Sequence, residues 1–322
     1  MIWYIAKRIL QMVPVILVVI ILNFVIVHLA PGDPALIMSG QQADWKYIEA
    51  VRAKFGLDRP IYEQLFIYLG AVAQGDLGFS IAQGRPVFQI LMEKLSSSML
   101  LVLVAEFVSL GIGIILGVYA ARKYLSKLDT SISLATLVFY SMPPFWLGLM
   151  LIILFSLNLQ WFPITGLISF GVKPEIGIEY YLNILWHLFL PALTLTLTIG
   201  IPIFTRITRA SMVEVMNEEY ILTARAKGLS ENRIFFTHAL RNALIPVITA
   251  AHVWIGMAFT GAVVVEIVFG WPGLGKLMFD SVAIRDYPVL MGIFIVVAVI
   301  VVVSSLISDI LAAFLDRRIT FE

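Results

Sequence analysis

Few residues in this chain have the type and spacing that chemistry at a protein site needs. The sequence has no cysteine, which excludes a disulfide framework, a thiolate zinc site and a cysteine nucleophile. Its four histidines are scattered, and no two have the H-x-x-x-H spacing of a helical metal site; they are His28, His187, His238 and His252. No nucleophile–base pair is readable at any spacing. We therefore expect no metal centre, no cofactor and no catalytic site on this chain.

One run comes close to a nucleotide-binding motif. Residues Gly270 to Leu277, Gly-Trp-Pro-Gly-Leu-Gly-Lys-Leu, nearly match G-x-x-x-x-G-K-[ST]. The last residue is leucine, so no hydroxyl is available for Mg²⁺, and the run follows an apolar segment rather than a strand. We interpret it as a Gly/Pro-rich turn. Any ATP that drives this protein must then be hydrolysed on another chain.

Ionisable side chains inside apolar segments are functional candidates by default. Glu106 lies well inside the second apolar segment, whereas Glu266 and Asp309 lie near segment ends. A chain of several carboxylates at mid-membrane would suggest a proton-driven carrier. Only Glu106 lies deep, which argues against that class. For Glu106 and His252 two interpretations stay open, a hydrogen bond between helices or the lining of a transport pathway.

The elements that must position these residues are membrane spans. The chain has 322 residues, of which 60% are hydrophobic and 13% charged, and its mean hydropathy is +0.96. Soluble domains are about 45–50% apolar and about 25% charged. Six apolar segments reach the roughly 20 helical residues that a bilayer crossing needs. They are Ile9–Leu29, Met99–Ala121, Ile132–Leu157, Trp186–Phe204, Ile245–Val268 and Val289–Phe314. Because lipid leaves backbone polar groups without partners, the sequence predicts an all-α integral membrane protein with six transmembrane helices.

Lysine and arginine in the short loops predict the orientation. Thirteen lie in the N-terminus, the loops 122–131 and 205–244 and the C-terminal tail, against three on the other side, Lys173, Lys276 and Arg285. The segment 30–98 is left out because loops beyond about 60 residues escape the rule. Both termini and the 205–244 loop are therefore expected to be cytoplasmic.

The segment 30–98 is expected to be a small helical extracytoplasmic cap. Helical patterns cover Ala43–Phe55, which Gly56 ends, and Ile61–Ala73, which Pro60 opens, with a shorter third candidate at Pro86–Leu95. The expected organisation is thus a first transmembrane helix with this segment at 1–98, followed by a five-helix core domain at 99–322.

The most polar stretch between two spans is the loop 205–244. One helix is predicted from about Ser211 to Lys227, with Met212, Met216, Tyr220 and Ala224 on one face. Gly228 is placed for a left-handed helix end. Ser230 can cap a second helix, whose apolar stripe pairs Phe235/Phe236, Ala239/Leu240 and Ala243/Leu244 before it runs into the fifth span near Pro246. Either this apolar stripe only packs on the bundle, or the loop docks into a groove of a cytoplasmic protein.

Several motifs, in chain order, resemble one known family. Tyr220-Ile-Leu-Thr-Ala-Arg-Ala-Lys-Gly228-Leu and His238-Ala-Leu-Arg-Asn-Ala-Leu-Ile-Pro246 look like the "EAA" loop of binding-protein-dependent ABC importer permeases, in the dipeptide/oligopeptide/nickel branch. The other matches are Arg8-Ile-Leu, Leu29-Ala-Pro-Gly-Asp-Pro34, Phe55-Gly-Leu-Asp-Arg-Pro60, Gly75-Asp-Leu-Gly-Phe-Ser80, Ser141-Met-Pro-Pro-Phe-Trp146, Val268-Phe-Gly-Trp-Pro-Gly-Leu-Gly275 and Arg285-Asp-Tyr-Pro288. The likeness covers nearly the whole chain.

The resemblance implies a type I ABC importer transmembrane architecture in the cytoplasmic (inner) membrane of a bacterium or archaeon. It implies four protein partners, namely a second homologous permease subunit, two cytoplasmic ATPases that hold ATP and Mg²⁺, and an extracytoplasmic solute-binding protein, and no nucleic acid. The residues that match the ATPase-coupling segment are Glu219, Tyr220, Thr223, Ala224, Arg225, Ala226, Lys227, Gly228 and Leu229. Segment 30–98 and the 269–288 loop are candidates for contacting the binding protein.

The chain departs from the general EAA pattern at two positions. The family's glutamate falls at Leu222 and its first alanine at Thr223, although Glu218 and Glu219 lie nearby. The contact is therefore expected to be more apolar than charged. The implied cargo is a di- or oligopeptide, with nickel complexes, glutathione or another small solute as alternatives. From a different class, a secondary transporter or channel would need a coupling-ion site or inverted repeats with broken helices, and neither is visible.

Overall fold

The computed structural model describes residues 2–29, 34–39, 44–80, 82–169, 171 and 177–315. Some residues used above lie outside these ranges, namely Ala30, Pro31, Gly32, Asp33, Ala43, Lys173, Arg317 and Arg318. The side chains of Lys7, Arg8, His252 and Asp309 also lie outside the description.

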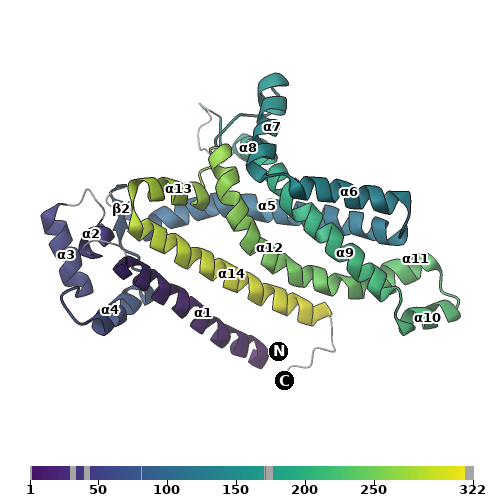
Figure 1. Ribbon diagram of the computed structural model, residues 1–322, viewed down its shortest axis with the longest axis horizontal. Helices are drawn as coiled ribbons and strands as arrows, with labels where there is room; N and C mark the ends of the chain where they lie inside the picture. Colours follow the sequence, from purple (N-terminus) through teal and green to yellow (C-terminus); the bar gives the residue numbers. More distant parts are fainter. Residues whose placement is uncertain are drawn as a thin grey trace. The chain divides into compact units, whose positions relative to one another are not determined.

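Almost every described element is a helix (Figure 1). In chain order they are α1 (Ile2–Leu29), α2 (Pro34–Ser39), α3 (Trp45–Phe55), α4 (Ile61–Ala73), β1 (Phe79–Ser80), β2 (Arg85–Pro86), α5 (Val87–Arg122), α6 (Lys127–Ser141), α7 (Pro144–Leu151), η1 (Ile152–Asn158), α8 (Ile178–Leu195), η2 (Thr196–Gly200), α9 (Ile201–Val215), α10 (Glu219–Ala226), α11 (Glu231–Arg233), η3 (Ile234–Ala239), α12 (Leu240–Val268), α13 (Leu274–Ile284) and α14 (Tyr287–Leu315). The three η elements are π-helical segments.

The helices match the six expected membrane spans. Within the described residues, four helical stretches are long and apolar enough to cross a bilayer: Val87–Arg122, Ile178–Val215, Glu231–Gly256 and Tyr287–Ser308. The bent pair formed by α6 with α7 and η1 makes a fifth. In α1, the described apolar stretch Leu10–Ile26 is shorter than these and coincides with the first expected span. The all-α membrane fold predicted from hydropathy is therefore confirmed.

Proline acts differently in the third and fourth spans. Between α6 and α7 the chain turns by 97° at Met142 and Pro143, where the Pro143-Pro144 pair interrupts the helix. The fourth span runs helically from Ile178 to Val215 and keeps both Pro191 and Pro202. Its π-helical segment η2 lies between the two prolines, a local adjustment that lets a helix absorb freed backbone groups.

The described chain divides into two compact units, and α5 and α14 contribute residues to both. The first consists mainly of 100–271 with the end of α14, and the second of 2–99 with 272–303. The second unit thus joins the segment after the fifth span to the N-terminal segment. The boundary at 98/99 expected from sequence stays a prediction.

In the first unit, glycines of α5 allow close contact with the fourth span. A methyl group at Gly113 would lie 2.5 Å from Phe204 Cβ, and one at Gly117 would lie 2.6 Å from Thr208 Cβ. A methyl at Gly200 of η2 would overlap the hydroxyl of Ser109. Small residues at such contacts let helix backbones approach closely in membranes, so α5 approaches the fourth span closely at these positions.

The second unit is built around the end of α1. Its core contains Ile20, Phe24, Val51, Tyr68, Met291 and Ile295. Asn23 donates from Nδ2 to the Met291 carbonyl over 3.3 Å, and the hydroxyl of Ser80 on β1 donates to the carboxylate of Asp286. Two motifs that stand far apart in sequence, Gly75–Ser80 and Arg285–Pro288, are thereby joined.

The N-terminal helices agree with the sequence in two places and differ in one. The helix α4 spans the predicted Ile61–Ala73, and α3 ends at Gly56 in the left-handed conformation, with φ 59°. The separate helix predicted at Pro86–Leu95 is wrong, because α5 begins at Val87 and continues to Arg122. The serines 96–98 that follow Leu95 do not stop a helix, since only glycine and proline carry a large penalty in its interior.

Candidate functional site

The polar loop 205–244 forms a compact structure at the joined ends of α9 and α12 (Figure 1). The single helix predicted from Ser211 to Lys227 is wrong, because α9 ends at Val215 and α10 begins at Glu219. At the break, Asn217 donates from its side chain to the Val213 carbonyl over 2.9 Å, and Glu218 takes an extended conformation. Asparagine side chains compete with helical hydrogen bonds in this way.

The break changes which residues share a face. Met212 is fully buried on α9, Ala224 is 8% exposed on α10, and Tyr220 is 39% exposed. The predicted stripe through these residues is therefore not a surface of one helix. Instead, α9 and α10 both contribute side chains to a common interior.

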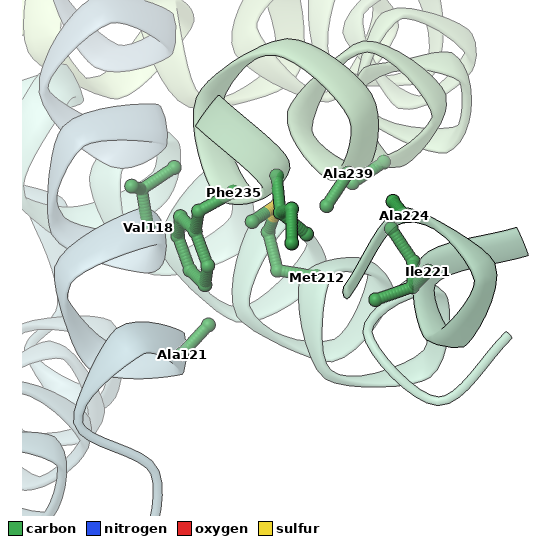
Figure 2. Packing of buried hydrophobic residues seen from close by; sticks show 9 residues of the cluster. Val118, Ala121, Met212, Ile221, Ala224, Phe235 and Ala239 are labelled. Carbon is green, nitrogen blue, oxygen red and sulfur yellow. The ribbon is translucent and has the colours of Figure 1, made fainter. Parts of the chain in front are cut away.

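That interior is a cluster of nine buried apolar residues, which we call the loop core (Figure 2). Its members come from α5, α9, α10 and the helix that leads into α12: Val118, Ala121, Met212, Ile221, Ala224, Ile234, Phe235, Ala239 and Ala243. Phe235, Ala239 and Ala243 of the predicted stripe are therefore buried in the loop core. Phe236 is 46% exposed, and Ile234, which was not part of the predicted stripe, is buried. The π-helical turn η3 in this region widens the helix and shifts the register of its buried side chains.

The helix α10 has two different faces. Ile221 (0% exposed) and Ala224 point into the loop core, whereas Leu222 is 57% exposed. The other exposed matches to the coupling segment are Glu219, Tyr220, Thr223, Arg225, Ala226, Lys227 and Gly228; Leu229 is half-buried. The residue that replaces the family's glutamate is thus an apolar side chain on the free face.

Gly228 makes the sharp turn after α10. Its φ is 73°, which confirms the left-handed helix end predicted from sequence. The Leu229 amide donates to the Ala224 carbonyl over 3.3 Å, and the Gly228 amide to the Arg225 carbonyl over 2.9 Å. An added Cβ at Gly228 would meet nothing within 4 Å, so backbone conformation and not space requires glycine there.

The two sides of this turn are held together by polar contacts. Arg225 donates to Glu231 from Nε over 2.9 Å and from Nη2 over 3.3 Å, and these hydrogen bonds raise the pKa of the Arg225 guanidinium. Ser230 occupies the predicted N-cap position of α11, but its side chain makes no capping hydrogen bond. Asn242 donates from Nδ2 to the Tyr220 hydroxyl over 2.7 Å, which links α10 to α12.

A buried ion pair at the base of α6 was not predicted from sequence. Asp129 is 2% exposed and accepts two hydrogen bonds from Arg209 of α9, from Nε over 2.5 Å and from Nη2 over 2.7 Å. The guanidinium of Arg209 also lies 5.2 Å from the ring centroid of Tyr124. The two partners stand 80 residues apart, so no local pattern could have found this pair.

Two clefts lie in the same unit. One of about 400 Å³ is bordered by Tyr124, Met216, Asn217 and Phe235, next to the loop core. The other, of about 250 Å³, lies between α6 and α9 and is bordered by Thr136, Tyr140 and Arg206, among others.

Of the pathway candidates, Glu106 is 5% exposed and does not border either cleft. Its Oε2 has no hydrogen-bond partner among the described residues. Its two interpretations both stay open, and the side chain of His252 lies outside the description. Across the described part of the chain, no group of three His, Cys, Asp or Glu side chains could hold a metal ion.

The near-match to a nucleotide-binding loop is a turn between helices. Gly270 has φ 59°, and Gly273 precedes α13. The Leu274 amide, at the start of that helix, donates to the Ser98 hydroxyl over 2.7 Å, so one amide that a phosphate would need is already used. The interpretation of this run as a Gly/Pro-rich turn agrees with this arrangement.

These features define an all-helical membrane component with a structured polar loop. Residues 113–321 match the family model of binding-protein-dependent transport system inner membrane components, and residues 1–102 match the model of the N-terminal part of such components. The chain belongs to this family.

Related proteins of known name cover the whole chain. It is 43% identical to the oligopeptide transport system permease protein AppB of Bacillus subtilis, over 99% of both chains. It is 38% identical to the di/tripeptide transport system permease protein DppB of Pseudomonas aeruginosa, over 100% of both, and 36% identical to the glutathione transport system permease protein GsiC of Escherichia coli K12, over 99% of both.

A solved structure shows the same fold. An inward-facing form of the MetNI methionine ABC transporter aligns with a TM-score of 0.58 at 17% identity, covering 71% of this chain and 97% of that chain. The predicted type I ABC importer architecture is confirmed by this likeness, and at such low identity the likeness concerns the fold alone.

Proposed function

We propose that this chain is one permease subunit of an ATP-driven importer that carries di- or oligopeptides across the cytoplasmic membrane by alternating access. The family match and the names of the relatives AppB and DppB support this proposal. The relative GsiC favours glutathione as the second candidate cargo. The subunit is not an enzyme, and ATP and Mg²⁺ would bind to partner ATPases.

The proposed assembly has four partner chains. A second homologous permease completes the pathway, two ATPases dock on the polar loop, and a solute-binding protein delivers cargo on the opposite side. The distribution of lysine and arginine supports placing the polar loop and both termini in the cytoplasm. The proposed organisation keeps a first span with an extracytoplasmic segment at 1–98 and a core domain at 99–322.

One observation carries the coupling role, namely the two faces of α10. Its inner face is fixed in the loop core, and its outer face leaves Leu222 free for a groove on a partner. A force on α10 therefore reaches α9 through Met212 and the helix leading to α12 through Ala239. The Arg209–Asp129 pair extends the same connection to α6. Movement of an ATPase would then shift a bundle that has two stable arrangements.

Cysteine cross-linking tests the docking. The native chain has no cysteine, so one introduced thiol gives an unambiguous signal. In the assembled transporter, Leu222→Cys should cross-link to a cysteine-bearing ATPase, whereas Leu128→Cys, on α6 and 46% exposed, is the matched control. Ala224 is a poor position because its side chain faces the loop core. Equal cross-linking at positions 222 and 128 would contradict docking on α10. So would the absence of cross-linking at position 222 and at its exposed neighbours.

Transport in vesicles tests the cargo. Vesicles with the assembled transporter and its binding protein should take up a labelled oligopeptide in the presence of internal ATP. An excess of unlabelled glutathione should leave this uptake unchanged. Uptake of glutathione in preference to peptide would establish the second candidate instead.

A further inference from the structure

The helix α4 exposes an apolar face that nothing in the described chain covers. Tyr62 is 60% exposed and Phe66 is 72% exposed. Ala73 continues the same face about two turns after Phe66. A methyl group built on Gly70, also on this face, would meet nothing within 4 Å. An ordinary surface helix places polar side chains on such a face.

The opposite face of α4 is packed against the end of α1. Gln64 and Tyr68 are 8% and 6% exposed. The ring centroids of Tyr68 and Phe24 lie 5.9 Å apart, and His28 Nε2 lies 2.9 Å from Gln64 Oε1. Because α4 is therefore apolar on two faces and packed on only one, the other needs a cover that the described residues do not supply.

The contact with α1 fixes the depth of α4 in the membrane. Phe24 and His28 belong to the last two turns of the first span, whose final residues Ile26 and Leu29 are 55% and 78% exposed. Side chains this apolar at the end of a span belong to its lipid-facing surface. A helix packed against these turns lies at the level where the hydrocarbon core meets the headgroups.

We propose that α4 is an interfacial helix whose Tyr62–Phe66–Ala73 face lies in the bilayer. Tyrosine suits this depth because its ring can stay among acyl chains while its hydroxyl reaches water. Two charged residues flank the Tyr62–Phe66–Ala73 face at the start of α4, where Arg59 pairs with Glu63 over 3.6 Å. The depth set by the contact with Phe24 and His28 of α1 favours lipid over a protein partner. On the orientation proposed above, the leaflet is the outer one.

The function proposed for this surface is anchorage. By holding α4 at the membrane surface, the lipid contact would fix the height of α3 and of the β1–β2 hairpin, which share the second unit with α4. A binding protein that approached this side would then meet a segment of constant height.

Spin-label accessibility tests the proposal. Single cysteines replace Phe66 and, as the matched control, Asp58, which is exposed just before α4; each is labelled with a nitroxide in the assembled transporter in phospholipid nanodiscs. At position 66, collisions with oxygen should exceed those with a water-soluble nickel chelate several-fold, and at position 58 the order should reverse. This pattern does not depend on which side of the membrane α4 occupies or on which solute is carried.

Two results would overturn the proposal. If the label at position 66 is as accessible to the nickel chelate as the label at position 58, the face lies in water. If it is shielded from both reagents, a protein covers the face, and the same measurement on the permease without its binding protein would show which one. Failure of peptide uptake would leave the accessibility pattern unaffected, so the two proposals fail separately.

Discussion

The short helices α10 and α4 each pack one face on the chain and leave the other uncovered. The free face of α10 carries Glu219 and Thr223 beside a large apolar side chain, Leu222. The free face of α4 carries Tyr62 and Phe66 and no charge. A face that mixes polar and apolar side chains suits reversible binding to a protein groove. A face of apolar side chains suits permanent contact with lipid. The two proposals thus assign the same packing scheme to two kinds of neighbour.

The largest effect is expected from charging the inner face of α10. Ile221→Asp would place an unpaired carboxylate in the loop core and destabilise the loop by on the order of 3 kcal/mol or more. Hydrogen exchange should show loss of protection across residues 219–243, together with loss of uptake.

The neighbouring variant Leu222→Asp is the control for that experiment. It should leave the protection unchanged and reduce only ATPase binding and uptake. If both variants unfold the loop equally, α10 does not have the two faces described here.

Breaking the ion pair of α6 and α9 should have the next largest effect. Asp129→Asn removes the charged acceptor of two Arg209 hydrogen bonds, at a cost of about 1–3 kcal/mol because Arg209 is partly exposed. ATPase activity should persist while uptake falls, since the loop would move without α6. The double variant Asp129→Asn/Arg209→Gln should cost less than the sum of the single changes, which a double-mutant cycle on stability would measure. Strict additivity would show that the pair contributes no coupling.

Gly228→Val is expected to have a smaller effect on stability. A β-branched residue at φ 73° costs about 1–2 kcal/mol, so α10 would end in a different direction. The chain should insert normally but hydrolyse ATP without importing solute. Gly228→Asn should be much milder because asparagine tolerates this conformation. Wild-type uptake by the valine variant would contradict the role given to the turn.

The smallest effect concerns pH and the second unit. Burial raises the pKa of Asp286, although hydrogen bonds from Ser80 and the Val289 amide oppose the rise. The folded state therefore holds its proton to higher pH than the unfolded state does, and stability falls as pH rises from the usual aspartate range through the raised pKa. After correction for the base-catalysed intrinsic exchange rate, the protection factors of residues 272–303 should be larger at pH 4 than at pH 8.

Two variants sharpen this pH measurement. Asp286→Asn should remove the pH dependence, because the titrating group is gone. Ser80→Ala removes a bond that favours the charged form and should steepen the dependence. An unchanged profile in the asparagine variant would assign the effect to another group.

The sequence predicted the features that depend on local backbone chemistry. Gly56 and Gly228 adopt the left-handed conformation, and Pro60 precedes α4 at its predicted start. The division between α9 and α10 was missed because Met216-Asn217-Glu218 contains neither glycine nor proline. The bonds between Arg209 and Asp129 and between Asn242 and Tyr220 join distant segments, so only tertiary structure reveals them.

The glycines of α5 limit how this subunit can move. Because methyl-sized space is already filled at Gly113 and Gly117, α5 cannot slide by a turn along α9 without overlap with Phe204 or Thr208. In the proposed transport cycle, the two helices would therefore rotate together. Distances between probes on α5 and α9 should then stay constant in every nucleotide state, which provides an internal ruler for measuring the displacement of other helices.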